Sequence, residues 1–513
     1  MFPRFPSALI GLLVLGLPPG WLMGQADESA DSPSLTLATA IREALAANLD
    51  IQVERLDREI AGAAVEAEAA IYDPVLFASG SVRNAEQTIT FTETEGTESD
   101  NRDYRLGVTQ AIPLTGASAT LDTGLSRRQS NAGVNRSNLS QEADVGLTVR
   151  QPLLQDFGRA VNLAALNRAR AADQAARLSF RSRILDLLRQ TEIAYWSVAF
   201  ARSRSDLTRT SIQLAENLLA EARAREEVGL ATRIDVLQAE AALAARRQEQ
   251  IDARQAVEEA LDNLNRILGR LTPERLPPEP TVAAPPADPA MPATETFDPY
   301  WNQVLTTHPD PQIQQAVILQ RTEDLRLAKN RARPTLDLSL SGGYNGLDDQ
   351  EAIDAYDAAL DRAGETWSIG LEFRMPWGMQ AEKANRLQAR KRLEQANLQL
   401  ADVRQQLFEL ARSVWRDATL SRQRLEAARR TLALQEAAFA QERSRYDNGL
   451  ATFREVLEAE RDLDAARVSE LNARFAVIEA AVGLTGLDGS ILQRHGFTWN
   501  EALAAAEATA AQP

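Results

Sequence analysis

The chain has 513 residues, a net charge of −16 and no cysteine. The acidic balance argues against nucleic acid as a partner, and the missing thiols exclude disulfides, thiolate metal sites and cysteine nucleophiles. Only two histidines occur, His308 and His495, so a histidine-based metal centre or a Ser-His-Asp triad is not expected. We predict no cofactor, no metal site and no catalytic residue.

The N-terminus has the layout of a secretory signal peptide, predicted over residues 1–26. Arg4 precedes an apolar run over residues 8–17, and small residues follow near position 26. This run is too short to span a membrane, and no later stretch approaches the roughly 20 apolar residues of a transmembrane helix. The sequence therefore predicts export, and any membrane insertion would have to use strands.

The rest of the chain reads as two similar halves, 27–271 and 300–486. Residues 272–299 between them hold nine prolines, which is typical of a linker. GLATRIDVLQAE, from Gly229, recurs 220 residues later as GLATFREVLEAE, from Gly449. Matches in the same order along both halves predict an internal duplication.

Each half has the same predicted order: a helix, strands, a long helix, the Gly-Leu-Ala-Thr break and a shorter helix. The predicted ranges are helix 35–71, strands about 75–152, helix 159–228, turn 228–235, helix 230–268, then helix 300–333, strands about 335–376, helix 383–448, turn 448–455, helix 450–484 and a C-terminal tail over 487–513. The long helix would measure roughly 100 Å. The two shorter helices of each half, laid end to end, match this length. We therefore expect a rod with strands at one end and the glycine turns at the other.

The strand segments alternate between apolar and polar residues. In WSIGLEFRM, from Trp367 to Met375, every second residue is apolar. This pattern is typical of a transmembrane barrel strand, although a half-buried strand of a soluble sandwich has it too. The first half carries a 36-residue extra arm, because GVTQAIP (107–113) and GLTVRQP (146–152) repeat at an offset of 39. Four to six strands do not close a membrane barrel, so a barrel would be shared among protomers.

These features together resemble the TolC-type outer-membrane efflux family. The residues that carry the resemblance are the opening LTLATAIREALAANLDIQ (35–52), the QPLL of Gln151–Leu154, the two Gly-Leu-Ala-Thr motifs and the duplicated order. The resemblance implies a fold that is mainly α with membrane β. In this fold the duplicated helix–strand–helix halves form a trimeric α-helical tunnel, capped by a shared transmembrane β-barrel.

The resemblance also implies a function and its partners. The protein would be a homotrimeric channel-tunnel in the outer membrane of a Gram-negative-type cell, with helices in the periplasm. It would give substrates a passive exit in tripartite efflux or type I secretion. Its partners would be a periplasmic adaptor (membrane fusion) protein, an inner-membrane transporter of RND or ABC type, and outer-membrane lipid. It would catalyse nothing.

Site residues are transferred by position. The periplasmic tip turns, where the adaptor docks, would be Gly229, Leu230, Ala231 and Thr232 with Gly449, Leu450, Ala451 and Thr452. Asp235 and Tyr446 match positions that hold the coils together across the closed tip. Glu455 and Glu458 match acidic positions around the narrowest point of the tunnel, and their i, i+3 spacing puts them on one helix face.

One position departs from the family pattern. The basic gate residue that the family can place two residues after the second glycine is Ala451 in this chain, and Arg454 lies three residues later. The sequence leaves open whether Arg454 takes over the bond to Asp235.

A structural coiled-coil protein of the periplasm or cell surface is the alternative. It explains the helical periodicity and the signal peptide, but not the alternating strands or the duplication. The sequence does not identify the cargo or the transporter class. It also leaves open whether the barrel has 12 strands or more, and what the extra arm does.

Overall fold

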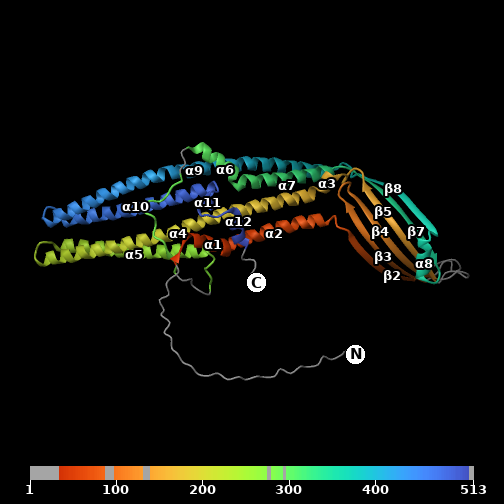
Figure 1. The fold of residues 1–513 in the computed structure, drawn as a ribbon, viewed down its shortest axis with the longest axis horizontal. Coiled ribbons are helices and arrows are strands. Elements are labelled where there is room, and N and C mark those ends of the chain that lie inside the picture. Colours follow the sequence, from red (N-terminus) through yellow and green to blue (C-terminus); the bar gives the residue numbers. More distant parts are fainter. Residues whose placement is uncertain (1–33, 87–97, 131–138, 274–278, 293–295, 508–513) are drawn as a thin grey trace, which may run out of the picture.

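The computed structural model describes residues 34–86, 98–130, 139–273, 279–292 and 296–507. The predicted signal peptide lies outside these ranges. The molecule is an elongated bundle of helices with a sheet at one end and two helix turns at the other (Figure 1). None of the described helices is both long enough and apolar enough to cross a membrane.

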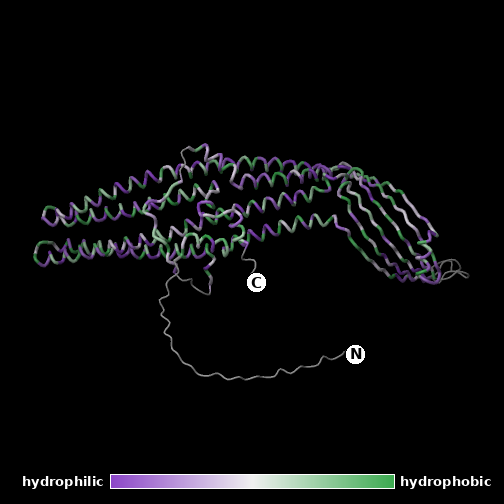
Figure 2. Tube along the Cα trace, in the orientation of Figure 1, coloured by the Kyte–Doolittle hydropathy of each residue, from purple (hydrophilic) through white to green (hydrophobic). Residues whose placement is uncertain are grey.

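The helices repeat in the two halves. Their bounds are α1 Leu37–Ala47, α2 Leu49–Ala70, α3 Arg159–Asn162, α4 Ala164–Glu227 and α5 Arg233–Ile267, then α6 Phe297–Thr307, α7 Pro309–Arg331, α9 Gln380–Asp447 and α10 Phe453–Leu487. The long helices α4 and α9 have 64 and 68 residues, so each spans roughly 100 Å. Polar and apolar residues alternate along all of them (Figure 2), as expected for helices with one packed and one solvated face. The predicted helix 159–228 is interrupted at Leu163, which separates α3 from α4.

The first helix of each half is two helices. The two single helices predicted there are therefore wrong (35–71 and 300–333). The breaks lie at Asn48 and His308, whose backbones are extended, with ψ of 126° and 132°. Each side chain caps the next helix: Asn48 accepts from the N–H of Asp50 at 3.0 Å, and His308 from that of Asp310 at 3.3 Å. Pro309 adds to the second break, because proline disfavours helical backbone in the residue before it.

These breaks lie where helices of one half meet end to end. The side-chain amide of Asn48 donates to the carbonyl of Ile267, at the end of α5, at 2.9 Å. In the second half, the hydroxyl of Thr307 donates to the carbonyl of Asp488, just beyond α10, at 3.0 Å. The predicted end-to-end stacking of the shorter helices is thus confirmed. It is held by equivalent contacts in the two halves.

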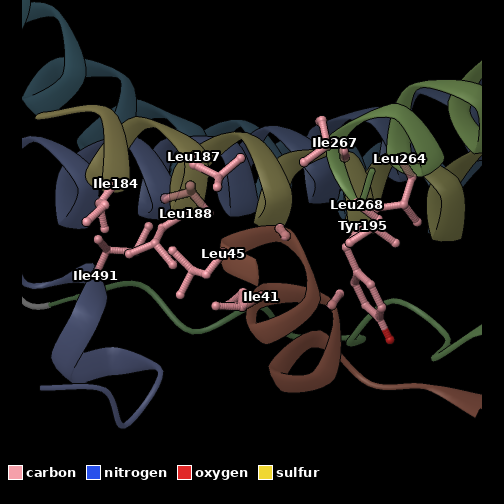
Figure 3. Packing of buried hydrophobic residues seen from close by; sticks show 14 of the residues in the cluster. Ile41, Leu45, Ile184, Leu187, Leu188, Tyr195, Leu264, Ile267, Leu268 and Ile491 are labelled. Carbon is pink, nitrogen blue, oxygen red and sulfur yellow. The ribbon is translucent and has the colours of Figure 1, made fainter. Parts of the chain in front are cut away.

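The largest apolar core lies at mid-rod (Figure 3). There Ile41 and Leu45 of α1 pack with Ile184 of α4 and Leu264 of α5, all of them buried. Two short C-terminal helices, α11 (Ile491–Arg494) and α12 (Trp499–Glu507), complete this cluster. The segment predicted as a tail over 487–513 is therefore part of the core over its described residues.

Part of the predicted linker is bound to the rod. Strand β1 (Ser34–Leu35) pairs in parallel with β6 (Thr281–Val282) across the middle of the bundle. The buried Tyr195 of α4 forms hydrogen bonds with residues at both strands. Its hydroxyl donates to the carbonyl of Leu35 and accepts from the N–H of Ala283, each at 3.0 Å. The described linker residues around Ala283 therefore lie against the helices.

The sheet has six antiparallel strands in the order β2-β3-β4-β5-β7-β8. Their bounds are β2 Val75–Glu86, β3 Glu98–Ile112, β4 Ala117–Ser130, β5 Leu139–Pro152, β7 Thr335–Asp348 and β8 Gly364–Arg374. The pair β5–β7 joins the two halves into one sheet. The extra arm of the first half therefore adds one hairpin, so that the first half supplies four strands and the second half two.

The register gives the sheet one apolar and one polar face. Residues that pair across neighbouring strands point to the same side. The apolar side includes Leu106, Leu121, Leu147, Leu340, Ile369 and Leu371. On the polar side lie the ion pair Arg105–Asp122, with atoms 2.5 Å apart, and the hydrogen bond between Ser341 and Ser368 at 2.8 Å. The alternation predicted for one strand thus extends across the whole sheet.

A short helix, α8 (Ala352–Leu360), connects β7 and β8, within the range of about 335–376 for which the sequence predicted strands alone. Its Ala355 and Ala359 pack against Ala143 of β5. Gly346 permits this close approach, because an added Cβ there would lie 2.1 Å from the carbonyl oxygen of Ala355. Helix α8 therefore covers the apolar face at the end of the sheet farthest from the rod (Figure 1).

Candidate functional site at the helix tips

The first tip turn follows the last residue of α4, Glu227, and is built around Gly229. This residue has a φ of 76°, in the left-handed region that only glycine adopts without a Cβ penalty. Its N–H donates to the carbonyl of Glu226 at 2.9 Å, and the N–H of Leu230 donates to that of Arg225 at 2.8 Å. These two bonds form a Schellman motif, which satisfies carbonyls at the end of a helix.

The second tip turn repeats this geometry at the end of α9. Gly449 has a φ of 74°, its N–H donates to Tyr446 at 3.0 Å, and Leu450 donates to Arg445 at 2.8 Å. An added Cβ at either glycine would meet nothing within 4 Å. Glycine is therefore required here by the backbone conformation and not by lack of space.

The threonine of each motif starts the following helix. Thr232 accepts from the N–H of Asp235 at 3.4 Å, while the carboxylate of Asp235 accepts from the N–H of Thr232 at 2.8 Å. Thr452 and Glu455 form the same reciprocal pair, at 3.4 and 2.6 Å. Each pair is a capping box, so the motif ends one helix and begins the next within seven residues.

The capping box gives Glu455 a structural role that the sequence analysis missed. Its carboxylate points back to Thr452, whose N–H and hydroxyl both donate to it and lower the pKa of Glu455. Glu458, one turn further along α10, is exposed. The two glutamates share a helix face as predicted, but only one has a carboxylate engaged in the cap. The Thr-x-x-Asp/Glu spacing was the signal for this role.

Both tips present leucine to solvent. Leu230 is 78% exposed and Leu450 is 70% exposed, whereas Ala231 and Ala451 behind them are half-buried. Burying a leucine side chain is worth about 1.5–3 kcal/mol, so leaving two exposed at the end of the rod is unfavourable in isolation. The tips thus offer an apolar contact surface.

Tyr446 lies just behind the second turn, in a small core shared by both hairpins. It is 6% exposed, and the Arg225 guanidinium lies 4.1 Å from the centre of its ring. The ring of Phe453 packs at 5.7 Å. Burial raises the pKa of the Tyr446 hydroxyl, and the nearby charge of Asp235 adds to this shift. The predicted gate residue Tyr446 thus lies in the core that also contains Val236, the neighbour of Asp235, and among the described residues no hydrogen bond joins Tyr446 to Asp235.

Four charged residues join α4 to α9 beside Tyr446; we call them the tip network. The Glu221 carboxylate lies 2.5 Å from Arg443 and 2.8 Å from Arg225, and Asp447 lies 3.5 Å from Arg225 and 3.6 Å from Arg443. Sequence reasoning missed these contacts because Glu221 and Arg443 are 222 residues apart and no local pattern marks such a pair.

Arg454 does not join Asp235 within the chain. Its side chain is exposed on α10, and in the described part of the protein no hydrogen bond or ion pair links it to Asp235. The Asp235 carboxylate oxygen that caps α5 also accepts from the hydroxyl of Thr232, at 2.7 Å.

A second contact between the hairpins lies further from the tip. Arg246 of α5 reaches Glu460 at 3.1 Å and Asp464 at 3.0 Å, both on α10. All three side chains are largely buried, and burial raises the pKa of Glu460 to about 7. The two hairpins are therefore connected by charge at two levels.

The capping role of Glu455 predicts a response to acid. Because its folded pKa is lowered, the stability that it gives the cap is complete above the unfolded pKa of about 4.3 and is lost as pH falls through the folded value. Hydrogen exchange, corrected for intrinsic pH effects, should show protection at the start of α10 falling below about pH 4. Glu455→Gln should weaken protection at pH 7 and remove its acid dependence.

Glu458→Gln is the matched control, because Glu458 lies on the same face without capping the helix. It should keep the acid dependence of the natural chain. Protection at the start of α10 that is unchanged in acid, or an unaltered acid response in Glu455→Gln, would contradict the role of the cap.

Comparison with known sequences places this chain in a family. The profile described as outer membrane efflux protein matches residues 118–270 and 301–490. The chain is 26% identical over 377 residues to protein CyaE of Bordetella pertussis, covering 72% of this chain and 76% of CyaE. It is 25% identical over 346 residues to the outer membrane efflux protein BepC of Brucella suis biovar 1, covering 67% and 72%.

Solved structures share the fold. The CmeC outer membrane channel of Campylobacter jejuni superposes with a TM-score of 0.67 at 16% identity, covering 93% of this chain and 89% of CmeC. The outer membrane protein VceC of Vibrio cholerae gives a TM-score of 0.65 at 18% identity, covering 88% and 96%. With the profile covering more than half of the sequence, the chain belongs to the outer membrane efflux protein family.

Proposed function

We propose that the protein is one subunit of a homotrimeric channel-tunnel. It gives a passive exit to substrates that an inner-membrane transporter of RND or ABC type delivers through a periplasmic adaptor. The observation that carries this proposal is the arrangement of a rod of roughly 100 Å between an apolar-faced sheet and two apolar tips. The sheet suits the outer membrane, and the rod is long enough to reach into the periplasm.

The sheet supports assembly from several copies. Its six strands are fewer than the eight of the smallest barrels, so one chain does not close a membrane barrel. Strand edges in lipid must be paired, because lipid offers no hydrogen-bond partner. Three copies around one axis, with the sheets forming one barrel and the helices one tunnel, meet this requirement. A periplasmic coiled-coil protein would not need an exposed apolar sheet face.

The names of the relatives support the proposed adaptor and transporter as partners. BepC is named an outer membrane efflux protein, and SepC of Pseudomonas putida is named the outer membrane protein of a probable efflux pump. A pump component in the outer membrane needs an energised transporter elsewhere and a connection to it. The exposed Leu230 and Leu450 are suited to contact an adaptor at the periplasmic end.

The tips also suit a gate. In the proposed closed state, Tyr446, Asp235 and Arg454 contribute to contacts across the tip, and the tip network holds α9 against α4. Opening then requires the hairpins α4–α5 and α9–α10 to part. The six carboxylates of Glu455 and Glu458, three copies of each, would surround the narrowest point and favour cations.

Crosslinking can test whether the adaptor docks at the tips. A photoreactive amino acid placed at Leu230 or Leu450 should crosslink to a periplasmic adaptor protein in whole cells, identified by mass spectrometry. The matched control is the same substitution at Leu371, which is 66% exposed but lies on the sheet. The adaptor should be absent from the control sample. Crosslinking to the adaptor from Leu371 and not from the tips would refute docking at this end.

Ion selectivity can test the proposed acidic ring. The purified channel in planar bilayers should pass cations in preference to anions, most strongly at low salt, because less salt screens the carboxylates less. Glu455→Gln combined with Glu458→Gln should move the reversal potential in a salt gradient towards zero. Equal permeability to both ions, unchanged by the two substitutions, would rule out the ring.

A further inference from the structure

We infer that the extra hairpin β3–β4 is part of the membrane wall, so that the shared barrel has eighteen strands. The inference rests on the proposed homotrimer, in which each copy contributes one six-stranded sheet. The strand β8 of one copy would pair with β2 of the next. The pore would then be wider than one built from four strands of each chain.

The hairpin lies within the sheet and not beside it. Strand β3 pairs with β2 from Val75↔Thr109 to Glu86↔Glu98, and β4 pairs with β5 from Ser118↔Arg150 to Gln129↔Leu139. Both ladders run nearly the full length of the strands. A flap folded over a narrower sheet would leave β2 beside β5, whereas here β3 and β4 separate them.

The hairpin has the same two faces as the other strands. On the apolar side Leu106 is 57% exposed and Leu121 is 52% exposed. Leu121 pairs directly with Leu147 of β5, and Leu106 lies one apolar position further along, opposite Thr123. On the polar side Arg105 pairs with Asp122, and the hydroxyls of Thr109 and Thr120 are 3.0 Å apart. One face is suited to lipid and the other to water, as in the wall of a membrane barrel.

The two edge strands of the sheet, β2 and β8, are suited to pair with each other between neighbouring copies. In the described residues β2 pairs only with β3, and β8 only with β7. Strand β2 leads away from the helix α2, and β8 leads back towards α9, so the two strands would meet antiparallel between copies. Six is an even number, so the up-and-down alternation continues across each junction. Pairing of these edges satisfies the backbone groups that lipid leaves without partners.

The strand number sets the width of the exit. With strands about 4.8 Å apart and tilted by about 40°, the backbone circle measures roughly 36 Å across for eighteen strands and roughly 24 Å for twelve. Barrels of sixteen to eighteen strands leave an aqueous channel, and here it would be lined by the polar face. The barrel would therefore admit bulky solutes, and the tip would be the part that limits size.

The test removes one copy of the repeated arm. Deleting residues 108–146 joins Gly107 to Leu147, which preserves the alternation of faces and leaves a strand that can pair with both β2 and β7. Neutral polyethylene glycols of graded size, added on the barrel side in planar bilayers, report the widest polymer that enters. The full chain should admit polymers of clearly larger radius than the deletion variant, because its backbone circle would be about 1.5-fold wider. An equal cut-off for both would overturn the inference.

A substitution pair tests the same point without a deletion. Leu121→Arg puts a charge on the apolar face of β4, and Thr120→Arg puts it on the polar face one residue away. Leu121→Arg should reduce heat-modifiable trimer in the outer membrane more than about tenfold, and Thr120→Arg should have little effect. Equal tolerance of both would place the hairpin outside the wall. A channel that is not trimeric would refute the proposed function itself, whereas a trimer that tolerates both substitutions would refute only the eighteen strands.

Discussion

Every backbone N–H and C=O group of a long rod and a membrane sheet needs a partner, and the tip turns, the mid-rod break at Asn48 and the strand ladders of the sheet supply such partners. At the tips, Gly229 and Gly449 allow a Schellman motif, and the following threonine caps the next helix. At mid-rod, Asn48 caps α2 and also bonds to the end of α5. Within the described part of the sheet, the outer edges of β2 and β8 are left for another copy to pair.

Charged contacts join the two hairpins at two levels. The tip network and the buried Arg246 with its two carboxylates join one hairpin to the other, whereas packing of apolar residues holds the middle of the rod. Buried ion pairs add little net stability compared with apolar packing, but breaking one is costly. Such contacts suit a joint that must hold one arrangement and yet be separable. The apolar core at mid-rod suits a part that stays fixed.

Much of this could be predicted from the sequence, because duplication repeats local patterns. The two glycine turns, the strand alternation and the matching helix lengths all follow from short-range spacing. The break at Asn48 was missed because a single cap inside a periodic stretch gives a weak signal, whereas the break at His308 was marked by Pro309 and Pro311 and could have been predicted. The tip network could not be found at all, since Glu221 and Arg443 meet only after both hairpins have folded. The capping role of Glu455 was readable in the Thr-x-x-Glu spacing but was overlooked in favour of the ring.

The central claim is that the channel stays closed because the tip network holds α9 against α4. The chain has no cysteine, so Glu221→Cys with Arg443→Cys breaks the network at its shortest contact, leaves only the 3.5 Å pair Arg225–Asp447, and introduces a unique pair for a short bismaleimide. Single-channel conductance in planar bilayers should rise above that of the natural chain before crosslinking and return to its level afterwards. Equal conductance in the crosslinked and uncrosslinked channels, with crosslinking shown to be complete, would contradict the account.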